Sequence, residues 1–414
     1  MSIISNETRE FGRQVHKKIQ PYFEKVDEIV DINTEKVLSA YRKHRVSEVM
    51  LGMTTGYGYD DVGRDTLDKI YADIFGTESA LVRIQFVNGT HAIAAAMFAC
   101  VKSGDTLLSI TGAPYDTLLN TVKGDFHGSF KSYGINYKQL EFSDSFDLDL
   151  IKQTILEDDS IKTIFIQRSK GYAQRITLPV EKIGEICAFV KSIKPELIVL
   201  VDNCYGEFVE KIEPTNVGAD LVCGSLIKNI GGGIAPTGGY IAGRSDLIEN
   251  ASFRLTAPGI GGECGSTLGN NRALYQGLFL ASHVVGQAIK TAIFTAQAML
   301  DLGYDVKPQP DEMRHDIIQT VDFGTPDPLL RFCEGIQSGS PIDSHVTPYP
   351  WDMPGYQDQV VMAAGAFIQG SSIELSADAP MREPYTCFVQ GGLTYESGKT
   401  GVLIAVDKIL NRNI

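Results

Sequence analysis

The chain has 414 residues, of which 43% are hydrophobic, and a formal net charge of −14 at pH 7. This length exceeds one typical domain and predicts two, and the hydrophobic content suffices for a sizeable buried core. The acidic balance argues against nucleic acid or an anionic membrane surface as the default partner.

The seven cysteines indicate a protein with reduced thiols. Their number is odd, they are scattered singly, and no Cys-x-x-Cys or Cys/His cluster has metal-ligand spacing. We therefore expect no metal site and a cytoplasmic location. Residues 1–46 are charged and have no apolar core of a secretory signal. No run reaches the roughly 18 apolar residues needed to span a bilayer, so no membrane partner is expected.

The N-terminal part is predicted to be helical around one polar loop. Residues 7–45 show helical spacing of apolar side chains and predict two helices, which pack on the body or on a partner subunit. A further helix is expected over residues 65–75. Between them, the string GYGYDDVGRD is a loop by its turn residues. Tyr57, Tyr59 and Arg64 on this loop would by themselves be ordinary surface residues.

The next segment predicts a strand, a tight turn and a helix. Residues 80–87 form the strand, Asn88 to His91 the turn and residues 92–101 a helix rich in small side chains. A strand over 106–110 follows. A Gly-Thr pair that opens a helix offers free backbone N–H groups and a hydroxyl, which suits a phosphate. A plain turn remains the alternative.

Two further features follow predicted strands. Tyr115 lies past the carboxyl end of a strand, where it can stack on a flat ligand or cap the core. The string QRSKGYAQR follows the strand 163–166, and its basic residues can hold an anion or form a solvated loop. These basic residues are Arg168, Lys170 and Arg175.

An acid and a lysine stand out in the middle of the chain. Asp202 ends the apolar run 197–201, which is typical of a buried parallel strand. Its carboxylate can cap the next turn or pair with a cationic ring nitrogen, because a buried charge needs a partner. Lys228 closes an apolar stretch spaced by small residues, which is unusual for a surface lysine. Partly buried lysines make good covalent nucleophiles.

The remainder of the chain predicts a strand, a long loop and a second domain. A strand is expected over 239–243, and a helix over 272–300 bridges into that domain. The Gly-rich segment 254–271 is expected near an active site or a subunit interface, because long loops are usually functional. The Pro-rich string SHVTPYPWDMPGY can shape a substrate pocket or be an inert surface loop. No GxxxxGK[ST] is present, which argues against a P-loop ATPase.

These motifs, taken together, resemble the fold-type I pyridoxal-phosphate enzymes. The order Gly89–Thr90, Tyr115, Asp202, Ser225, Lys228 is similar to that of the cystathionine/methionine lyase branch. The strings GYGYDDVGRD, FVNGTHA, QRSKGY, VDNCYGEF and GSLIKNIGGGIAPTGGYIAG resemble more closely the bacterial aluminium resistance, or methionine gamma-lyase-like, family. This closer match spans nearly the whole chain.

The resemblance implies a fold and a domain organisation. The fold would be α/β, with a mostly parallel central sheet flanked by helices and a smaller α+β C-terminal domain. We expect an N-terminal helical arm over 1–48, a large cofactor-binding domain over 49–289 and a small domain over 290–414. Pyridoxal 5'-phosphate would be the cofactor.

The resemblance also implies roles for individual residues. Lys228 would carry the cofactor as an aldimine and move protons, and Asp202 would hold the ring N–H so that the ring stays an electron sink. Tyr115 would stack on the ring and could act as acid or base. The phosphate would be bound by Gly89, Thr90 and Ser225. His91 would stack on the cofactor or only start its helix.

The chain departs from the cystathionine branch on the substrate side. The branch grips the phosphate with a Tyr-x-Arg loop of the neighbouring subunit, but here Tyr57 and Tyr59 stand without that arginine. The branch also has a late arginine for the substrate carboxylate, and none lies at the matching place here. We therefore expect Arg382, in SADAPMREPY, to bind substrate, with Arg168 as the second candidate and Tyr59 nearby.

The predicted function is a carbon–sulfur lyase that eliminates a thiol from an amino acid such as cystathionine, cysteine or methionine. The alternatives are a transferase or racemase that uses the same cofactor, or a non-catalytic cofactor-binding regulator. We expect a homodimer or homotetramer with its active site at the subunit interface.

Overall fold

The computed structural model describes residues 3–173, 175–353 and 358–411. The chain divides into two compact units, each made of separate segments. The first unit comprises Met1–Thr34, Ile227–Gly233 and Leu280–Ile414, and the second comprises Glu35–Leu226 and Ile234–Phe279. The domain boundaries expected after residues 48 and 289 stay a prediction.

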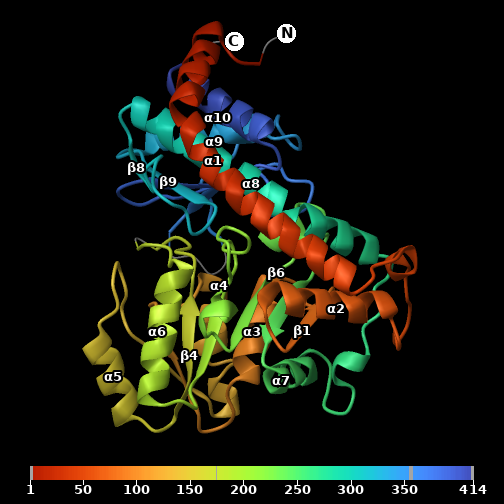
Figure 1. The fold of residues 1–414 in the computed structure, drawn as a ribbon. Helices are drawn as coiled ribbons and strands as arrows, with labels where there is room; N and C mark the ends of the chain where they lie inside the picture. The colour runs from red at the N-terminus through yellow and green to blue at the C-terminus, as the bar shows by residue number, and fades with distance from the viewer. Residues whose placement is uncertain (1–2, 174, 354–357, 412–414) are drawn as a thin grey trace. The chain divides into compact units, whose positions relative to one another are not determined.

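The second unit is built on a seven-stranded sheet with the order β1-β7-β6-β5-β4-β2-β3 (Figure 1). Strands β2 to β6 run parallel to one another, whereas β7 is antiparallel to both β6 and β1. The sheet is therefore mostly parallel, as predicted. Its strands are β1 (Ser79–Arg83), β2 (Thr106–Ser109), β3 (Asn136–Gln139), β4 (Ile161–Gln167), β5 (Ile198–Asp202), β6 (Leu221–Ser225) and β7 (Gly239–Gly243).

Helices make the connections that a parallel sheet requires. Most of them carry one buried apolar stripe and pack it against the sheet. The helices of this unit are α2 (Val62–Phe75), α3 (Gly89–Ala99), α4 (Asp116–Val122), α5 (Leu148–Glu157), α6 (Val180–Ile193) and α7 (Ser245–Leu255). The flanked sheet confirms the predicted α/β class.

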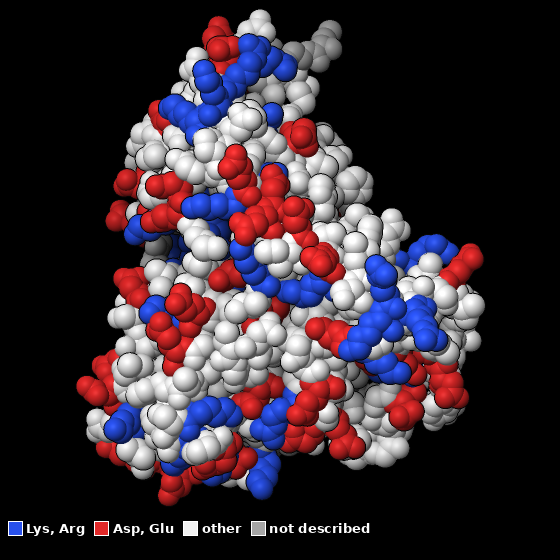
Figure 2. Space-filling model, in the orientation of Figure 1, with Lys and Arg blue, Asp and Glu red and all other residues white. Residues whose placement is uncertain are grey.

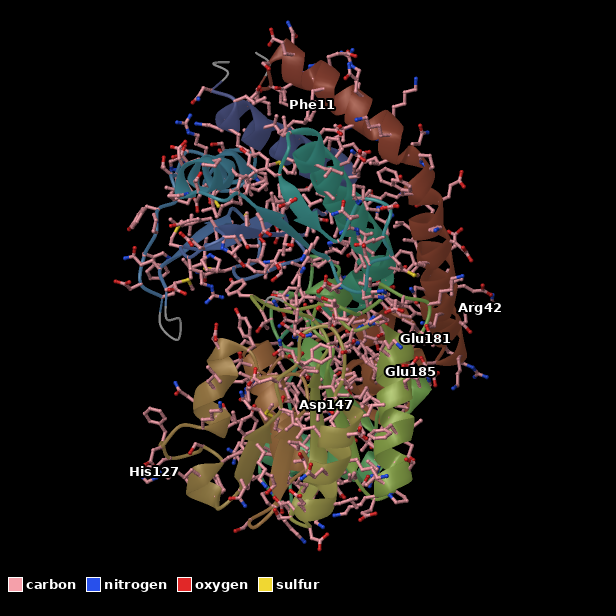
Figure 3. All side chains as sticks on the ribbon, turned by 90° about the vertical axis from the view of Figure 1, so that its left-hand side faces the viewer. Phe11, Arg42, His127, Asp147, Glu181 and Glu185 are labelled. Carbon is pink, nitrogen blue, oxygen red and sulfur yellow. The ribbon has the colours of Figure 1, made fainter. Side chains whose placement is uncertain are left out.

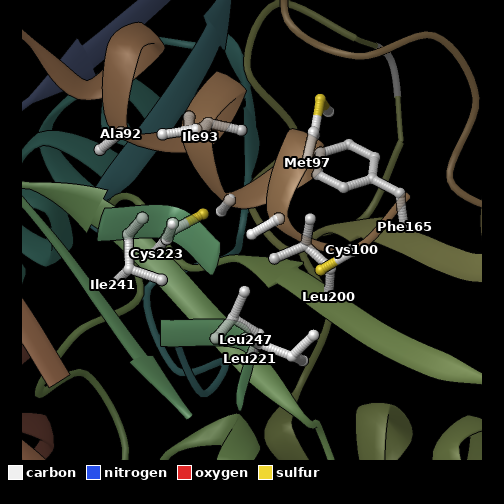
Figure 4. Close-up of a cluster of buried hydrophobic side chains, with 14 of the residues drawn as sticks. Ala92, Ile93, Met97, Cys100, Phe165, Leu200, Leu221, Cys223, Ile241 and Leu247 are labelled. Atoms are coloured by element: carbon white, nitrogen blue, oxygen red, sulfur yellow. The ribbon is translucent and has the colours of Figure 1, made fainter. Parts of the chain in front are cut away.

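A hydrophobic cluster seats α3 on the sheet (Figure 4). Ala92 and Met97 of α3 belong to the same buried cluster as Cys223 of β6 and Ile241 of β7. The approach is close, because a Cβ atom placed on Gly239 would lie 2.7 Å from the Cβ of Ala92. Small side chains on both elements thus bring the start of α3 down to the ends of the strands.

Two boundaries near the site differ from those predicted from the sequence. The predicted strand 80–87 ends at Arg83, because its partner β7 offers only five residues to pair with. The helix predicted to begin at Ala92 begins at Gly89. Its N-cap is Asn88, whose Oδ1 accepts the N–H of His91 at 2.9 Å. The predicted turn is therefore the first turn of α3.

The first unit contains a five-stranded sheet with the order β10-β11-β12-β9-β8, in which all neighbours are antiparallel. Helices α9 (Pro326–Ser338) and α10 (Tyr395–Ile409) pack on each other at Gly335 and Ala405. This arrangement agrees with the predicted smaller α+β part. The strands are β8 (Asp305–Lys307), β9 (Ile318–Asp322), β10 (Val360–Ala364), β11 (Ser376–Pro380) and β12 (Thr386–Gln390).

The prediction of two N-terminal helices was wrong. A single helix, α1 (Asn6–Lys43), contains Pro21 in its interior and continues from the turn of Phe11 to that of Arg42 (Figure 3). Proline removes one backbone hydrogen bond, but burial of one face continues past it. The buried apolar side chains of this face are Val15, Ile19, Phe23, Val26, Ile29, Val37 and Ala40.

The second long helix, α8 (Asn271–Asp301), packs beside α1 in the first unit. The Oγ of Ser282 donates to the carbonyl of Val30 at 2.9 Å. Among the described residues, α8 is also the helix long and apolar enough to cross a membrane, but 72% of its apolar window is buried in the structure. Its composition is therefore explained as that of a core helix.

Charged side chains cover much of the surface. Figure 2 shows acidic and basic residues interspersed over the face that it presents. Such mixing, with a net charge of −14, favours solubility.

Candidate active site

The carboxyl ends of three parallel strands bring polar side chains to one edge of the second unit's sheet. Strand β4 ends at Gln167, β5 at Asp202 and β6 at Ser225. Gln167 and Asp202 lie opposite each other in the register. Open α/β sheets bind their ligands at this edge.

Asp202 is a buried carboxylate, 5% exposed, at the end of a strand whose interior residues are fully buried. Its Oδ1 accepts the N–H of Cys204 at 3.1 Å, so the side chain caps the turn that follows β5. One oxygen of Asp202 therefore caps the next turn, which is one of the two roles expected from the sequence. The other role, pairing with a cationic ring nitrogen, stays a prediction.

The first turn of α3 lies beside Ser225. A Cβ atom placed on Gly89 would lie 3.0 Å from the Cβ and 3.6 Å from the Oγ of Ser225. The N–H groups of Gly89 and Thr90 are in the first turn, where the helix supplies no acceptor for them. Two residues far apart in the sequence therefore present donors at one place.

Thr90 and His91 have local partners in this turn. The Oγ1 of Thr90 lies 2.7 Å from that of Thr117 in α4. The N–H of Val87 donates to Nδ1 of His91 at 3.2 Å. Burial lowers the pKa of His91 and the charge of Arg254 lowers it further, so the ring is neutral with its proton on Nε2. Its role as a stacking group stays a prediction.

Tyr115 precedes α4 and is held at its backbone. Its N–H donates to Oε1 of Gln167 at 2.7 Å, and its ring meets the ring of Tyr172 edge-on with centroids 6.3 Å apart. The ring is half-buried. Gln167, which the sequence analysis passed over, therefore positions Tyr115 next to the edge that carries Asp202. The position of Gln167 at the end of a predicted strand was the signal that could have identified this residue.

Lys228 lies three residues beyond Ser225, in the segment that belongs to the first unit. Its side chain is half-buried, and Nζ donates to Oγ of Ser372 at 2.8 Å. The sequence analysis missed Ser372. Its signal was weak, because Gly370–Ser371–Ser372 reads as an ordinary turn, and the partner is 144 residues away.

Arg168 is placed in a structural role. Its side chain is fully buried, and the guanidinium donates to Asn203, Gly206 and Glu210 at 2.7 to 2.9 Å. These contacts tie β4 to the segment that follows β5. The geometry disfavours Arg168 as a substrate ligand, because its hydrogen bonds hold protein atoms. Arg175 is also buried and donates to backbone carbonyls of its own loop.

Arg382, in contrast to these two arginines, is exposed. It follows β11, its side chain is 52% exposed, and Nη1 pairs with Asp358 at 3.1 Å. An exposed guanidinium in a weak surface pair can be recruited by an anionic ligand. The structure thus distinguishes the two predicted arginines by burial. Of the Pro-rich loop named in the sequence analysis, residues 354–356 lie outside the described part of the chain.

Tyr59 stacks on Tyr57 on an exposed loop, with ring centroids 5.4 Å apart and an interplanar angle of 18°. A hydrogen bond with Cys264, and then the charge of that thiol, raise the pKa of the Tyr59 hydroxyl. Arg64 ties this loop to the Gly-rich segment, since Nη1 donates to the carbonyls of Gly58 and Gly265 at 2.6 and 3.1 Å. Arg64 is therefore a structural residue that holds the loop on which the two tyrosines lie.

The residues at this edge fit pyridoxal 5'-phosphate. A phosphate suits a helix N-terminus beside a hydroxyl, and only a glycine at position 89 leaves the space in front of Ser225. A buried carboxylate such as Asp202 suits a protonated ring nitrogen. These donors match the phosphate and the ring nitrogen of the cofactor.

Comparisons with known proteins identify the family and the fold. A family model described as methionine gamma-lyase matches residues 8–410. A solved carbon–sulfur lyase involved in aluminum resistance from Clostridium novyi NT has a TM-score of 0.94 and 52% identity, and the match covers 98% of this chain and 97% of that one. Uncharacterized protein YnbB of Bacillus subtilis is 50% identical over 404 residues, which is 97% of this chain and 96% of YnbB. The pyridoxal-5'-phosphate dependent protein YhfS of Escherichia coli has a TM-score of 0.63 at 18% identity, covers 93% of this chain and 97% of its own, and shares the fold.

Proposed function

The chain belongs to the methionine gamma-lyase family, and we propose that it is a pyridoxal-phosphate-dependent lyase that cleaves a carbon–sulfur bond of an amino acid. The name of the Clostridium novyi relative supports the reaction class. The single observation that supports the cofactor best is the contact between Gly89 and Ser225 at the edge where β5 ends in Asp202. We also propose a cytoplasmic location, because all seven cysteines are free thiols.

The cofactor would be held at its phosphate and at its ring. The N–H groups of Gly89 and Thr90 and the hydroxyl of Ser225 would donate to the phosphate. Asp202 would accept the proton of the ring nitrogen, and Tyr115 would stack on one face of the ring. When bound, pyridoxal phosphate supplies an electron sink for a carbanion at the substrate's α-carbon.

Lys228 would anchor the cofactor and move the proton at the substrate's α-carbon. Its Nζ donates to Ser372, which directs the amine and leaves its lone pair for a proton transfer once the amine is neutral. The bond to sulfur would then break at the β-carbon, or at the γ-carbon once a second proton has left the β-carbon, and a thiol would leave. Hydrolysis of the remaining fragment gives a keto acid and ammonia. Cystathionine, cysteine and methionine are the substrates to which this chemistry applies.

Arg382 would bind the substrate carboxylate. Its guanidinium is exposed and pairs with Asp358, whereas that of Arg168 is buried and donates to protein atoms. A planar guanidinium binds a carboxylate through two parallel hydrogen bonds.

We further propose a homodimer or homotetramer in which the loop that carries Tyr57 and Tyr59 reaches the active site of the neighbouring subunit. The loop and the Gly-rich segment expose a cluster of large apolar and aromatic side chains. These are Val49, Met53, Tyr57, Tyr59, Val62, Ile260 and Leu268. Backbone hydrogen bonds join the two segments, from Gly265 to Tyr57 at 2.9 Å and from Leu268 to Thr54 at 3.1 Å. An apolar surface of this kind is typical of a protein interface.

The deciding experiment combines reconstitution with product analysis. The purified protein should take up pyridoxal phosphate, turn yellow and lose its visible band on borohydride treatment. Keto acid should appear from at least one sulfur amino acid, and a Lys228→Ala variant should release none. A colourless protein that takes up no cofactor would contradict the whole proposal. Cofactor uptake with racemisation, with group transfer, or with no turnover of any amino acid would favour the respective alternatives.

A further inference from the structure

The segment after β5 buries several acids around one arginine. Arg168 forms ion pairs with Glu210 at 2.7 Å and with Glu213 at 3.8 Å. The two carboxylate oxygens of Glu213 also accept the N–H of Phe208 at 3.0 Å and the side-chain amide of Asn203 at 2.9 Å. A cation and hydrogen bonds therefore surround these two carboxylates.

Glu207 in the same segment lies in a different environment. Its side chain is fully buried, and the hydroxyl of Tyr240 in β7 donates to its Oε1 at 2.9 Å. A hydroxyl is a neutral donor, so it stabilises a carboxylate less than a guanidinium does. The ring of Tyr240 is itself fully buried and stacks on Phe75 of α2, with centroids 5.1 Å apart. The donor is therefore held in place by core packing.

The carboxyl group of Glu207 presses against β6 at a glycine. A Cβ atom on Gly224 would lie 2.6 Å from Oε1 of Glu207. Gly224 separates Cys223, which lies opposite Asp202 in the register, from Ser225. Because side chains alternate along a strand, Glu207 lies on the sheet face opposite to the one where Ser225 meets α3. Glu207 is thus directly behind the strand ends that form the candidate site.

We propose that Glu207 is a positioning residue that, as an uncharged carboxylic acid, keeps a second negative charge away from Asp202. Asp202 then stands as the ionised group at this edge and presents its charge to the ring nitrogen. The cofactor half of this inference rests on the proposed function.

The electrostatic surroundings agree with this role. Burial raises the pKa of Glu207 most, hydrogen bonds from a backbone N–H and from Tyr240 lower it, and the charges of Glu213 and Asp202 raise it by less, so that it lies at about 8. The other titratable groups near it are Tyr71 of α2 and, on the opposite face of β6, Cys223, and burial raises the pKa of both. At neutral pH these neighbours are uncharged, so the proton on Glu207 decides the charge behind the site.

A first test uses the protein without cofactor. The band of a protonated carboxylic acid in the infrared spectrum at pH 7 should be lost in Glu207→Gln. It should persist in Glu185→Gln, whose carboxyl is exposed on α6 and labelled in Figure 3. An unchanged spectrum in Glu207→Gln would overturn the proposal, since Glu207 would then be ionised.

Stability gives an independent readout of the same proton. The unfolded chain ionises Glu207 at its ordinary pKa of 4.5, while the folded protein retains the proton up to about pH 8. Stability is therefore full below about 4.5 and falls as pH rises toward 8. Relative to Glu207→Gln, the wild-type unfolding constant should rise by up to about tenfold per pH unit in this window and level off above it. A difference that does not vary with pH would contradict the inference.

The link to Asp202 needs the protein with cofactor. In wild type, the ¹⁵N resonance of the ring nitrogen of labelled pyridoxal phosphate should move between pH 7 and 9, with a midpoint near that of Glu207. Glu207→Gln should lack this step, and Tyr240→Phe should shift it to higher pH, because the lost hydrogen bond favours the charged form. If Glu207→Gln retains the step, the positioning role is wrong although the proton is real. Absence of bound cofactor would instead contradict the proposed function and leave the first two tests standing.

Discussion

Gly89 and Ser225 are in contact across the start of α3 and the end of β6, with 3.0 Å between the Cβ of Ser225 and a Cβ atom placed on Gly89. The first-turn N–H groups and the serine hydroxyl thereby converge on one point. We propose that this relationship makes the edge of the sheet a phosphate seat rather than a row of unrelated polar residues.

Gly89→Ala should therefore weaken cofactor binding. The added methyl group meets Ser225 and narrows the seat, so we expect the Kd for pyridoxal phosphate to rise about tenfold, which corresponds to about 1.4 kcal/mol. Gly262→Ala is the matched control, because its Cβ atom would come no closer than 3.6 Å to a neighbour. Fluorescence titration of the apo-protein measures both. Equal affinities would mean that the phosphate lies elsewhere.

Ser372→Ala should reduce turnover while cofactor is still bound. Without the acceptor at 2.8 Å, Nζ of Lys228 loses its direction, and we expect kcat to fall by about ten- to a hundredfold. Ser371→Ala provides the control, since among the described residues the buried Oγ of Ser371 has no hydrogen-bond partner. Keto-acid release and cofactor absorbance are measured together. Similar losses in both variants would point to a general packing effect.

Arg382→Gln should weaken substrate binding and leave the later steps of the reaction nearly unchanged. We expect KM for a sulfur amino acid to rise about tenfold with kcat nearly retained, because one charge-assisted contact to the carboxylate is lost. Arg331→Gln removes a comparable surface arginine, paired with Asp327 on α9, and should leave KM unchanged. An unaltered KM in Arg382→Gln would exclude this arginine as the carboxylate ligand.

Asp61→Asn should destabilise the loop that carries the tyrosines. Asp61 caps α2 through the N–H of Arg64 at 2.8 Å and accepts the hydroxyl of Thr267 at 2.8 Å. A carboxamide donates where these partners also donate, so we expect a loss of about 1 to 2 kcal/mol in the free energy of unfolding at pH 7.

The same variant should also change the response to acid. Burial raises the pKa of Asp61, but hydrogen bonds, led by that from Arg64, outweigh this effect and hold it below 3.8. The stabilisation is therefore present above pH 3.8 and is lost as pH falls through the lower folded value. Urea unfolding of both proteins between pH 3 and 7 should show the difference shrinking at the acid end. A constant difference would contradict the role of the charge.

Mixed oligomers test the proposed interface. Lys228→Ala and the double variant Tyr57→Ala/Tyr59→Ala should each be nearly inactive. If each site takes its tyrosines from the neighbour, subunits mixed under exchange conditions should regain activity, because some sites then hold all intact residues. Subunits mixed without exchange serve as the control. No recovery after proven exchange would place the tyrosines in their own subunit's site or outside any site.

Local patterns predicted much of the second unit correctly. The strand 239–243 agrees with β7 in both bounds, and the apolar run 197–201 overlaps β5 in all but its first residue. Glycine turns and apolar periodicity are local signals, so they are readable without the fold. The single helix α1 was not readable in this way, because burial along its whole length outweighs the local effect of Pro21.

The candidate site was only partly visible in the sequence. Motif order alone singled out Asp202, Ser225 and Lys228 and implied the cofactor. It ranked Arg382 above Arg168 as the substrate ligand, but both are basic residues in polar strings, and their difference in burial is seen only in the structure.

The sequence by itself determined the family, the order of the strands and helices in much of the second unit and the residue types that a pyridoxal cofactor requires, because these depend on local pattern and on motifs. The tertiary structure decided which of these residues meet. The contact of Gly89 with Ser225, the hydrogen bond of Lys228 to Ser372 and the place of Glu207 behind β6 each join residues distant in the chain. Such pairings follow from packing and sheet register, and no local property of either partner encodes them.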